Sequence, residues 1–531
     1  MPHPNILMIL ADELRADALG CYDNAICRTP NLDRLANQGA RFDQCMITQP
    51  TCTPSRASIL TGCFPSALRS RMVGCETPDD PRFLPRLLSA AGYRTASIGK
   101  IHLVPQGQEP AYVERTRKPD GTLDYYGFDH VDLVNGHGMG CFGPQYSPWL
   151  NERVPDAKSR VAAAARRAPG VNSGSILTQT WNLPPEAHAG EYITERTNDY
   201  LRDAATHDEP FFLHVSFNDP HHPFTVPEPY ASLYDPDVMP APLPPVAEAG
   251  GATELQIKTL HGSATAFEDG RASDRLIGTP PADYTRIPTR DWQATKAVYY
   301  GMVSLLDAQV GRILRTLDET GLADNTVVVF VSDHGEYLGD HGFCGKGFHY
   351  DSVIRTPLLM RGPGIATGLR LGGVASTLDI APTLLDLTGV TIPDAIQGVS
   401  MLAALTAGGS LPRDAVLTEN DDDFVPMRAR TLTTLDWKIT LYASSDDGEL
   451  YDRRQDPDEL HNRWHDPECF PIRQALLAAL ADHLICAVDG ANGRIQSPTR
   501  PIARFLPGPH PGVKRSRGHE VIMPNMRTQP C

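Results

Sequence analysis

Short apolar runs alternate with amphipathic helical patterns over the first two thirds of the chain. The runs NILMIL, RTASIG, FFLHVSF and TVVVFVS are rich in β-branched or aromatic residues. Between them, NLDRLANQGARF and VYYGMVSLLDAQVGRILRTLDETG have a helical period and are closed by glycine. This alternation predicts an α/β fold with a large mixed, mostly parallel sheet flanked by helices.

Two long segments interrupt the alternation, and a third pattern follows it. Residues 107–188 and 227–290 are rich in proline, glycine and charge, which is typical of lids or substrate loops. After about Pro412 come the short strands AVLTEN, RTLTTLDWKITLY and GELYD, and then the helix IRQALLAALADHLICAV. We therefore expect a catalytic α/β domain at 1–412 and a small antiparallel α+β subdomain at 413–489. The tail at 490–531 is either disordered or an arm ordered by a neighbouring subunit of a homo-oligomer.

Composition limits the classes of partner and compartment. The chain has 531 residues, of which 41% are hydrophobic, so it can bury a large core. Its net charge of -16 argues against wholesale binding to nucleic acid or to an anionic membrane surface. The N-terminal apolar run is too short for a transmembrane helix, and it lacks the basic region and cleavage site of an export signal. The eleven cysteines lack CxxC spacing, so we expect a cytoplasmic protein with mostly free thiols.

Acidic and histidine side chains follow two of the predicted strands. Asp12 and Glu13 come directly after NILMILA, and Asp333 and His334 come directly after TVVVFVS. Ligands of open α/β sheets bind beyond the carboxyl ends of the strands, so these side chains are candidates for one site. Oxygen-rich ligands with one imidazole suit a divalent cation such as Ca²⁺, Mg²⁺ or Mn²⁺.

Cationic and imidazole side chains follow two further strands. Lys100 and His102 come after RTASIG, and His221 and His222 come after FFLHVSF in a loop with prolines. Lys346 lies between glycines in GFCGKGFHYD. A lone lysine is normally a surface residue, and a lone histidine is more often structural than catalytic. Several of them with a divalent metal indicate a dianionic or oxyanionic substrate group.

The stretch TCTPSRASILTG, residues 51–62, is too polar for an ordinary core helix and contains Cys52. It resembles the signature of the sulfatase family, in the alkaline phosphatase-like superfamily. The segments TPNLDRLANQGARF, GKIHL, PHHPF, SDHGEYLGDHG and GELYDRRQDPDELHN also resemble sulfatase segments, in the expected order from Asn5 to about Pro467.

The resemblance implies a purpose for Cys52. In cysteine-type sulfatases a formylglycine-generating enzyme oxidises this residue to formylglycine, and the hydrated aldehyde is the nucleophile. A serine or cysteine sulfate ester would need a second attack by water, whereas a geminal diol can eject sulfate and regenerate the aldehyde. An inert buried thiol is the alternative for a single cysteine, but the neighbouring Pro54, Ser55 and Arg56 are in register with the signature.

Roles for the other residues are implied by the same resemblance. The implied metal ligands are Asp12, Glu13, Asp333, His334 and one oxygen of the modified Cys52. The implied catalytic residues, besides Cys52, are Arg56, Lys100, His102, His221 and Lys346. Arg56 would hold the hydrate, and Lys100 and Lys346 would neutralise sulfate oxygens. His102 would deprotonate the hydrate, and His221 would act on the leaving-group side. His222 occupies the variable place of the P-H-x-P motif.

Two positions depart from the sulfatase pattern. Glu13 stands where aspartate or glutamine is usual, and His334 stands where many sulfatases have asparagine. The Asp-His pair is similar to phosphonate monoester hydrolases and their arylsulfatase relatives, which leaves Ca²⁺ and Mn²⁺ open. Lys100 with His102 resembles the sulfatase set and favours sulfate.

We therefore expect hydrolysis of a small alkyl, aryl or sugar sulfate monoester. The first alternative is a phosphonate monoester or phosphodiester hydrolase with the same nucleophile. An alternative of another class is a non-catalytic relative that only binds anions.

Overall fold

The computed structural model describes residues 3–119, 121–166, 178–249, 251–262, 284–421 and 427–488. The predicted tail at 490–531 lies outside these ranges. Within them no helix is both long and apolar enough to span a membrane. The nine cysteines whose side chains the structure describes are free thiols.

A nine-stranded sheet forms the centre of the molecule, with the order β4-β3-β5-β1-β6-β8-β2-β7 and with β9 beside β2. The strands are β1 (Asn5–Ala11), β2 (Ala40–Met46), β3 (Arg94–Gly99), β4 (His130–Leu133), β5 (Phe211–Ser216), β6 (Thr326–Ser332), β7 (Arg355–Thr356), β8 (Leu358–Arg361) and β9 (Leu369–Ser376). Strands β3, β4, β5, β1 and β6 pair in parallel, whereas β7 and β8 run antiparallel to their neighbours. The predicted mixed, mostly parallel sheet is confirmed.

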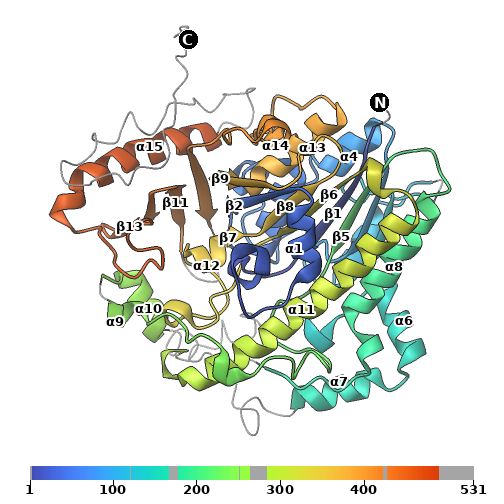
Figure 1. Ribbon diagram of the computed structural model, residues 1–531, viewed down its shortest axis with the longest axis horizontal. Helices are drawn as coiled ribbons and strands as arrows, with labels where there is room; N and C mark the ends of the chain where they lie inside the picture. Colours follow the sequence, from blue (N-terminus) through green and yellow to red (C-terminus); the bar gives the residue numbers. More distant parts are fainter. Residues whose placement is uncertain are drawn as a thin grey trace.

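Helices surround this sheet (Figure 1). The α-helices of the described residues are α1 (Pro30–Asn37), α2 (Cys52–Thr61), α3 (Pro65–Leu68), α4 (Leu84–Ala90), α5 (Glu109–Arg115), α6 (Tyr146–Arg153), α7 (Ala157–Arg166), α8 (Ala189–Ala204), α9 (Val246–Ala249), α10 (Glu254–Gly262), α11 (Thr289–Glu319), α12 (Asp351–Ile354), α13 (Ile380–Thr388), α14 (Leu402–Ala407) and α15 (Phe470–Val488).

The alternation of side chains along β1 supplies two hydrophobic cores, one on each face of the sheet. Leu7 and Ile9 pack into the core that α1, α6, α8 and α11 cover. Ile6, Met8 and Leu10 pack into the opposite core, beneath α2, α4, α13 and α14. Because successive strand residues point to opposite faces, a strand covered on both sides must be apolar throughout. The uninterrupted run NILMILA follows from this burial.

A second, four-stranded antiparallel sheet consists of β10 (Ala415–Asn420), β11 (Ala429–Thr434), β12 (Trp437–Tyr442) and β13 (Gly448–Asp452). Helix α15 packs on one face of it through Leu476 and Leu480. The other face contacts aromatic residues of the segment Phe343–Tyr350. The predicted small antiparallel sheet is confirmed, whereas the domain boundaries at 412 and 489 stay predictions.

The segment at 107–188 contains more regular structure than its composition predicts. It holds α5, β4, α6 and α7 within the described residues. Strand β4 adds to the parallel edge of the large sheet by pairing with β3. Its four residues, HVDL, are too short a run to be distinguished from a loop by their period alone.

Candidate active site

Four adjacent strands of the large sheet place their following residues at one edge. In the order β3-β5-β1-β6, Lys100 follows β3, Asp12 follows β1 and Asp333 follows β6, while His221 lies in the loop after β5. All four side chains are buried. The structure therefore brings together residues that lie up to 321 positions apart, as between Asp12 and Asp333.

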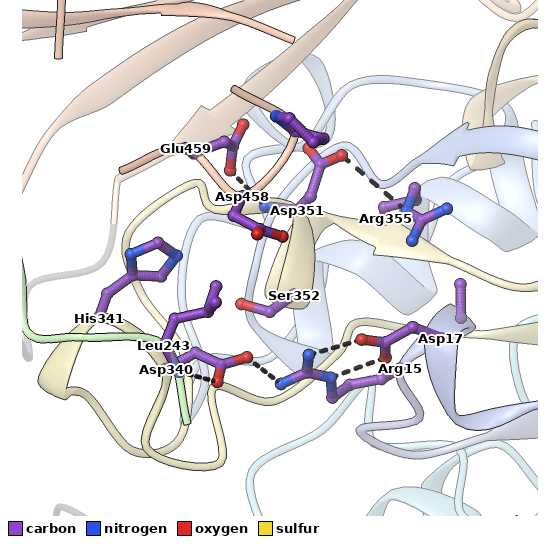
Figure 2. A pocket seen from close by; sticks show the side chains of 12 residues that line it. Arg15, Asp17, Leu243, Asp340, His341, Asp351, Ser352, Arg355, Asp458 and Glu459 are labelled. Carbon is purple, nitrogen blue, oxygen red and sulfur yellow. Dashed lines mark hydrogen bonds and ion pairs between the residues drawn. The ribbon is translucent and has the colours of Figure 1, made fainter. Parts of the chain in front are cut away.

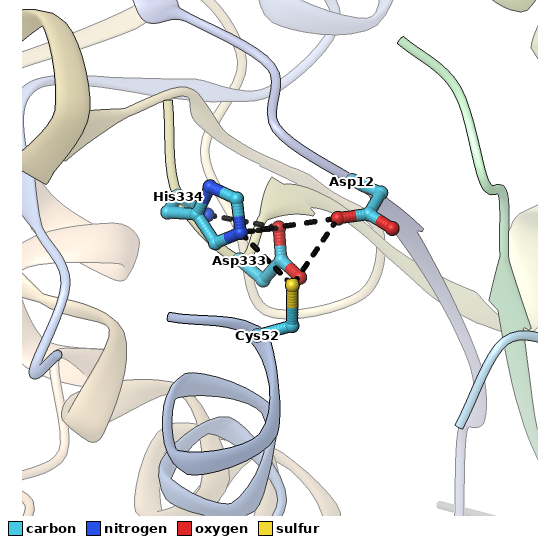
Figure 3. Close-up of side chains that lie close together, drawn as sticks. All are labelled: Asp12, Cys52, Asp333 and His334. Atoms are coloured by element: carbon cyan, nitrogen blue, oxygen red, sulfur yellow. Dashed lines mark hydrogen bonds and ion pairs between the residues drawn. The ribbon is translucent and has the colours of Figure 1, made fainter. Parts of the chain in front are cut away.

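Cys52 lies at the start of α2 and faces this edge of the sheet (Figure 3). Its Sγ is 3.2 Å from His334 Nε2 and 3.8 Å from Asp12 Oδ1. Two ammonium groups also approach the sulfur, Lys346 Nζ at 3.4 Å and Lys100 Nζ at 3.9 Å. In a formylglycine form of the protein, this sulfur marks the place of a hydrate oxygen.

Internal hydrogen bonds explain how so polar a helix as α2 can be buried. All ten residues of the helix are buried, so each polar side chain needs a hydrogen-bond partner inside the protein. Ser58 Oγ donates to the carbonyl oxygen of Cys63 at 2.7 Å, and Thr61 Oγ1 donates to that of Ala57 at 2.7 Å. Ser55 Oγ instead donates to the Asp333 carbonyl oxygen at 2.6 Å. The Ser55 contact joins α2 to the residue that follows β6.

Arg56 is the second connection between α2 and the strand ends. Its Nε donates to Asp333 Oδ2 at 2.7 Å, and its Nη1 donates to the Lys100 carbonyl oxygen at 2.7 Å and to Ser216 Oγ at 2.9 Å. Arg56 is 1% exposed, so these hydrogen bonds must compensate for the water that its charged guanidinium loses on burial. One arginine thus ties the ends of β3, β5 and β6 to the helix that carries Cys52.

The charges around Cys52 favour an anion at its side chain. Burial raises the pKa of the thiol, but the ammonium groups of Lys100 and Lys346 outweigh burial and lower the pKa to about 5. A group that carries negative charge at this position is therefore stabilised before any substrate arrives.

Asp12, Cys52, Asp333 and His334 each offer one ligand atom, and these four atoms lie within 4.8 Å of one another (Figure 3). His334 Nδ1 lies 2.9 Å from the Gly335 carbonyl oxygen, which fixes the ring and leaves Nε2 toward the cluster. Burial and the Asp12 carboxylate raise the pKa of Asp333. A divalent cation between the two carboxylates would relieve this repulsion, so the donor set fits a hard metal ion.

The Glu13 carboxylate contacts a different set of groups. Its Oε2 is 2.9 Å from His222 Nδ1 and 3.3 Å from His221 Nδ1, and its Oε1 is 3.3 Å from Lys346 Nζ. Burial lowers the pKa of His222, but the charge of Glu13 and then Glu336 raise it to about 9. The role of Glu13 as a metal ligand stays a prediction.

His102 is buried, and neither of its ring nitrogens has a hydrogen-bond partner within the described residues. Burial and then the positive charges of Lys100 and Arg56 hold its pKa well below the usual value. The ring is therefore neutral, and one of its nitrogens carries a lone pair. Unpartnered buried nitrogens are costly unless a ligand or water meets them, so the ring is suited to act on a bound molecule.

His137 is a site residue that the sequence patterns did not single out. Its Nε2 lies 2.8 Å from Lys100 Nζ and 3.5 Å from Asp12 Oδ2. Its ring stacks on that of His221, with centroids 3.6 Å apart and an interplanar angle of 8°. The available signal was the short strand β4, which ends four residues before His137 and places it near the same edge as the other strand ends.

A second pocket lies apart from this cluster, and Figure 2 shows its lining. Arg15 pairs there with Asp17 at 2.6 Å and with Asp340 at 2.7 Å, while Asp351 lies 3.9 Å from Arg355. None of the predicted site residues lines this pocket. Its arginines pair with carboxylates of the lining, and Lys438 of the small sheet pairs with Asp351 and Glu459. The predicted nucleophile and its surrounding lysines and histidines lie elsewhere, so we place the chemistry at Cys52.

Comparison with known proteins agrees with the signature around Cys52. The sulfatase family pattern matches residues 4–390, and the pattern of the N-sulphoglucosamine sulphohydrolase C-terminal region matches residues 339–484. The chain belongs to the sulfatase family. The resemblance inferred from the motifs is confirmed, and this sulfatase is an enzyme of the sulfuric ester hydrolase class.

Three relatives show how far the similarity of this sulfatase extends. An arylsulfatase of Clostridium perfringens is 28% identical over 466 residues, covering 86% of this chain and 90% of the relative. The multifunctional alkaline phosphatase superfamily protein PehA of Trinickia caryophylli is 30% identical over 430 residues, 77% and 78% of the two chains. A solved phosphonate monoester hydrolase of Agrobacterium radiobacter has a TM-score of 0.74 and 27% identity, covering 91% of this sulfatase and 96% of that chain.

Proposed function

We propose that this sulfatase hydrolyses a small alkyl, aryl or sugar sulfate monoester with a formylglycine derived from Cys52. The observation that carries the proposal is the convergence of Asp12, Asp333 and His334 on Cys52, between the ammonium groups of Lys100 and Lys346. Such a site can hold a cation, an anionic nucleophile and a sulfuryl group within contact of one another.

Asp12, Asp333 and His334 would hold one divalent metal ion, Ca²⁺ or Mn²⁺, together with an oxygen of the modified residue 52. When bound, the ion would supply Lewis-acid stabilisation of negative oxygen at the reacting centre. Arg56 keeps the Asp333 carboxylate in place through its 2.7 Å hydrogen bond. The hydrated formylglycine would supply the nucleophilic oxygen.

Lys100 and Lys346 approach the Cys52 sulfur from two different segments, at 3.9 and 3.4 Å. We assign them to the sulfate oxygens, because two ammonium groups can neutralise a dianionic transition state better than one. The His221 ring lies on the Lys346 side, with Nε2 3.1 Å from Lys346 Nζ. We assign His221 to the leaving oxygen.

His102 is assigned as the base. Its ring is neutral, because burial and then Lys100 hold its pKa well below the usual value, and its nitrogens have no partner among the described residues. It can therefore take the proton whose removal lets sulfate depart.

Three measurements on one preparation test this proposal. Peptide mass analysis should find residue 52 wholly or partly as formylglycine, and chelation of divalent metal should abolish turnover. Steady-state rates with a matched pair of aryl esters, one sulfate and one phosphonate, should favour the sulfate. Full activity with residue 52 only as an unmodified thiol would contradict the nucleophile, and full activity after chelation would contradict the metal.

The second candidate is a phosphonate monoester or phosphodiester hydrolase with the same residues. It is favoured by His334 after Asp333 and by the similarity to the phosphonate monoester hydrolase of Agrobacterium radiobacter, with a TM-score of 0.74. A higher kcat/KM for the aryl phosphonate than for the aryl sulfate would select it. A non-catalytic anion-binding relative is disfavoured, because every type of active-site residue is retained.

The remaining assignments concern the surroundings of the enzyme. We propose maturation by a formylglycine-generating enzyme, because Cys52 lies in the sequence CTPSR. A cytoplasmic location, the absence of nucleic-acid and membrane partners, and a homo-oligomer built through the C-terminal tail stay predictions.

A further inference from the structure

His137 belongs to none of the roles assigned above, yet it contacts groups on both sides of the site. Its Nε2 lies 2.8 Å from Lys100 Nζ, and its ring stacks on His221 with centroids 3.6 Å apart. An ammonium group can only donate hydrogen bonds, so Nε2 accepts and the ring proton lies on Nδ1. Lys100 and His221 do not neighbour each other in sequence, and His137 is a side chain that touches both.

The loop that carries His137 is held in a fixed shape. Asn135 and Phe142 exchange two backbone hydrogen bonds, at 2.7 and 2.9 Å, and close the loop at its base. Asn218 Nδ2, from the segment before His221, donates to the Gly136 carbonyl oxygen at 2.8 Å. Gly136 has φ +79, and a Cβ there would lie 2.7 Å from the Gly140 carbonyl oxygen. The ring of His137 is therefore presented by a rigid turn.

The contact with Lys100 matters because Lys100 has a competing partner. Lys100 Nζ also forms a short ion pair with Asp12, whose other oxygen faces Cys52. With Asp12 alone as its partner, the ammonium would be drawn toward that carboxylate and away from the space above Cys52. His137 adds a second acceptor from another direction, which fixes the position of the charge without adding charge of its own.

The contact with His221 matters because an imidazole ring can rotate about the Cβ–Cγ bond that joins it to the rest of its side chain. His221 Nδ1 lies 2.5 Å from the His222 carbonyl oxygen and 3.3 Å from Glu13 Oε2, and its Nε2 lies 3.1 Å from Lys346 Nζ. These contacts hold the nitrogen atoms at the edge of the His221 ring. The parallel ring of His137 covers the face of the His221 ring. Stacking of this kind restricts the tilt of the ring and hence the direction of Nε2.

We propose that His137 is a positioning residue that fixes Lys100 through Nε2 and His221 through its ring face. The proposal rests on the proposed function, in which Lys100 meets the sulfuryl oxygens and His221 meets the leaving oxygen. Loss of the first contact should weaken binding of the sulfuryl group. Loss of the second should raise the dependence of the rate on the leaving group.

Two substitutions separate the contacts. His137→Gln keeps an acceptor for Lys100 and loses the ring, whereas His137→Phe keeps a ring on His221 and loses the acceptor. His137→Ala loses both. His130→Ala is the matched control, since this histidine begins β4 in the same segment, is 48% exposed and does not contact the site.

The first measurement is calorimetric binding of inorganic sulfate to the metal-loaded proteins. We expect about tenfold or greater loss of affinity in His137→Ala and His137→Phe, and recovery in His137→Gln, since hydrogen bonds to charged groups contribute at this level. His137→Ala should have no further effect in a Lys100→Ala background, because the two residues act through one contact. Two results would overturn the contact with Lys100. One is an equal loss of sulfate affinity in His137→Gln and His137→Phe. The other is a double variant of His137 and Lys100 whose loss of affinity is the sum of the two single losses.

The second measurement is kcat/KM over a series of aryl esters with leaving groups of rising pKa. The slope should steepen in His137→Ala and His137→Gln and stay near the wild-type slope in His137→Phe and His130→Ala. A wild-type slope in all four variants would overturn the contact with His221. Elemental analysis for bound metal and a thermal melt accompany each variant, and if His137→Ala does not fold, the Gln and Phe pair still decides both contacts.

These readouts separate failure of the inference from failure of the proposed function. Sulfate affinity is measured without turnover, so it tests the hold on Lys100 even if wild-type enzyme hydrolyses no sulfate ester. If the wild-type enzyme prefers phosphonates, the leaving-group series uses aryl phosphonates and the same comparison of slopes applies.

Discussion

At the scale of single residues, the site favours negative charge at position 52. The sulfur of Cys52 contacts two ammonium groups and an imidazole, which outweigh the opposing carboxylates of Asp12 and Asp333. An ordinary buried thiol behaves differently, as Cys45 shows, because burial raises its pKa. The difference between these two cysteines can be measured before any substrate is known.

In metal-free protein made without a maturation enzyme, iodoacetamide should alkylate Cys52 at a rate that rises from about pH 4 to pH 6 and is constant above. The thiolate is the nucleophile, and the two lysines outweigh burial and lower the pKa of this thiol to about 5. Cys21 is the internal control, because burial and Asp33 raise its pKa to about 12. Peptide mass analysis follows both sites, and a Cys52 rate that rises only above about pH 8 would contradict the arrangement of lysines.

His102→Ala and His221→Ala should impair different steps. Without the neutral base at 102, substrate should be attacked but sulfate should not leave, so intact mass should increase by one sulfuryl group. Without His221, rates should fall more for poor leaving groups than for activated aryl esters, because a good leaving group needs little protonation. Intact mass and a leaving-group series distinguish the two, and an adduct in His221→Ala alone would reverse the assignment.

Much of the site could be predicted from residues that directly follow apolar runs, because parallel strands carry their ends to one edge. Asp12, Lys100 and Asp333 were found in this way. His137 was not, because the four-residue strand before it is too short to show a period. The contacts of Glu13 could not be predicted either, since they depend on the partners that the fold provides, here His221 and His222.

At the scale of elements, α2 is positioned by polar contacts to the end of β6. Ser55 Oγ donates to the Asp333 carbonyl oxygen at 2.6 Å, whereas Ser58 Oγ donates to Cys63, at the end of its own helix, at 2.7 Å. Both hydroxyls are buried, so we expect the two hydrogen bonds to contribute similarly to the free energy of unfolding. Only the first of them links the nucleophile to a metal-ligand candidate.

Ser55→Ala and Ser58→Ala should therefore lose similar stability but different activity. Each should lower the free energy of unfolding by about 1–3 kcal/mol, the cost of leaving a buried acceptor without its donor. Ser55→Ala should also reduce kcat and metal affinity, because α2 shifts relative to Asp333. Thermal melts, metal titration and steady-state rates measure these effects, and equal activity loss in both variants would contradict the link.

Element boundaries followed the sequence less closely than element types. The pattern NLDRLANQGARF predicts a helix closed by glycine, and the structure ends α1 at Asn37, before Gly39, but begins at Ala40 a strand, β2, that the pattern does not predict. A Cβ on Gly39 would lie 2.1 Å from the Met360 carbonyl oxygen, so the turn is set by the approach of β8. Contacts between segments this far apart in the sequence cannot be predicted from the local period of hydrophobic residues.

At the scale of the whole molecule, the small sheet supports the segment that carries Lys346. Lys438 of β12 donates to the His349 carbonyl oxygen at 2.9 Å and to Asp351 Oδ1 at 2.6 Å, and it pairs with Glu459. Its side chain is 1% exposed. This buried network joins β12 and the residues after β13 to the chain just beyond Lys346.

Lys438→Ala should destabilise the protein by about 3–5 kcal/mol, because Glu459 is left buried without its close cation, whereas Asp351 keeps its ion pair with Arg453. It should also raise KM, because the segment with Lys346 loses its support. Arg454→Ala is the control: its side chain is 72% exposed, and such surface pairs contribute about 1 kcal/mol or less. Thermal melts and steady-state kinetics compare the two, and a normal KM in a destabilised Lys438→Ala would contradict the support of Lys346.

The complete burial of α2 also sets an order of events during synthesis of the chain. Cys52 is 3% exposed, and Arg56 of the same signature is held by Asp333, which emerges from the ribosome much later. Under the proposed maturation, an enzyme that acts on residues 52–56 would have no access to them once β6 has joined the sheet. Oxidation of Cys52 would then have to precede this step of folding. The fraction of active enzyme should be decided while the nascent chain still lacks β6, and should rise when translation through that interval is slowed.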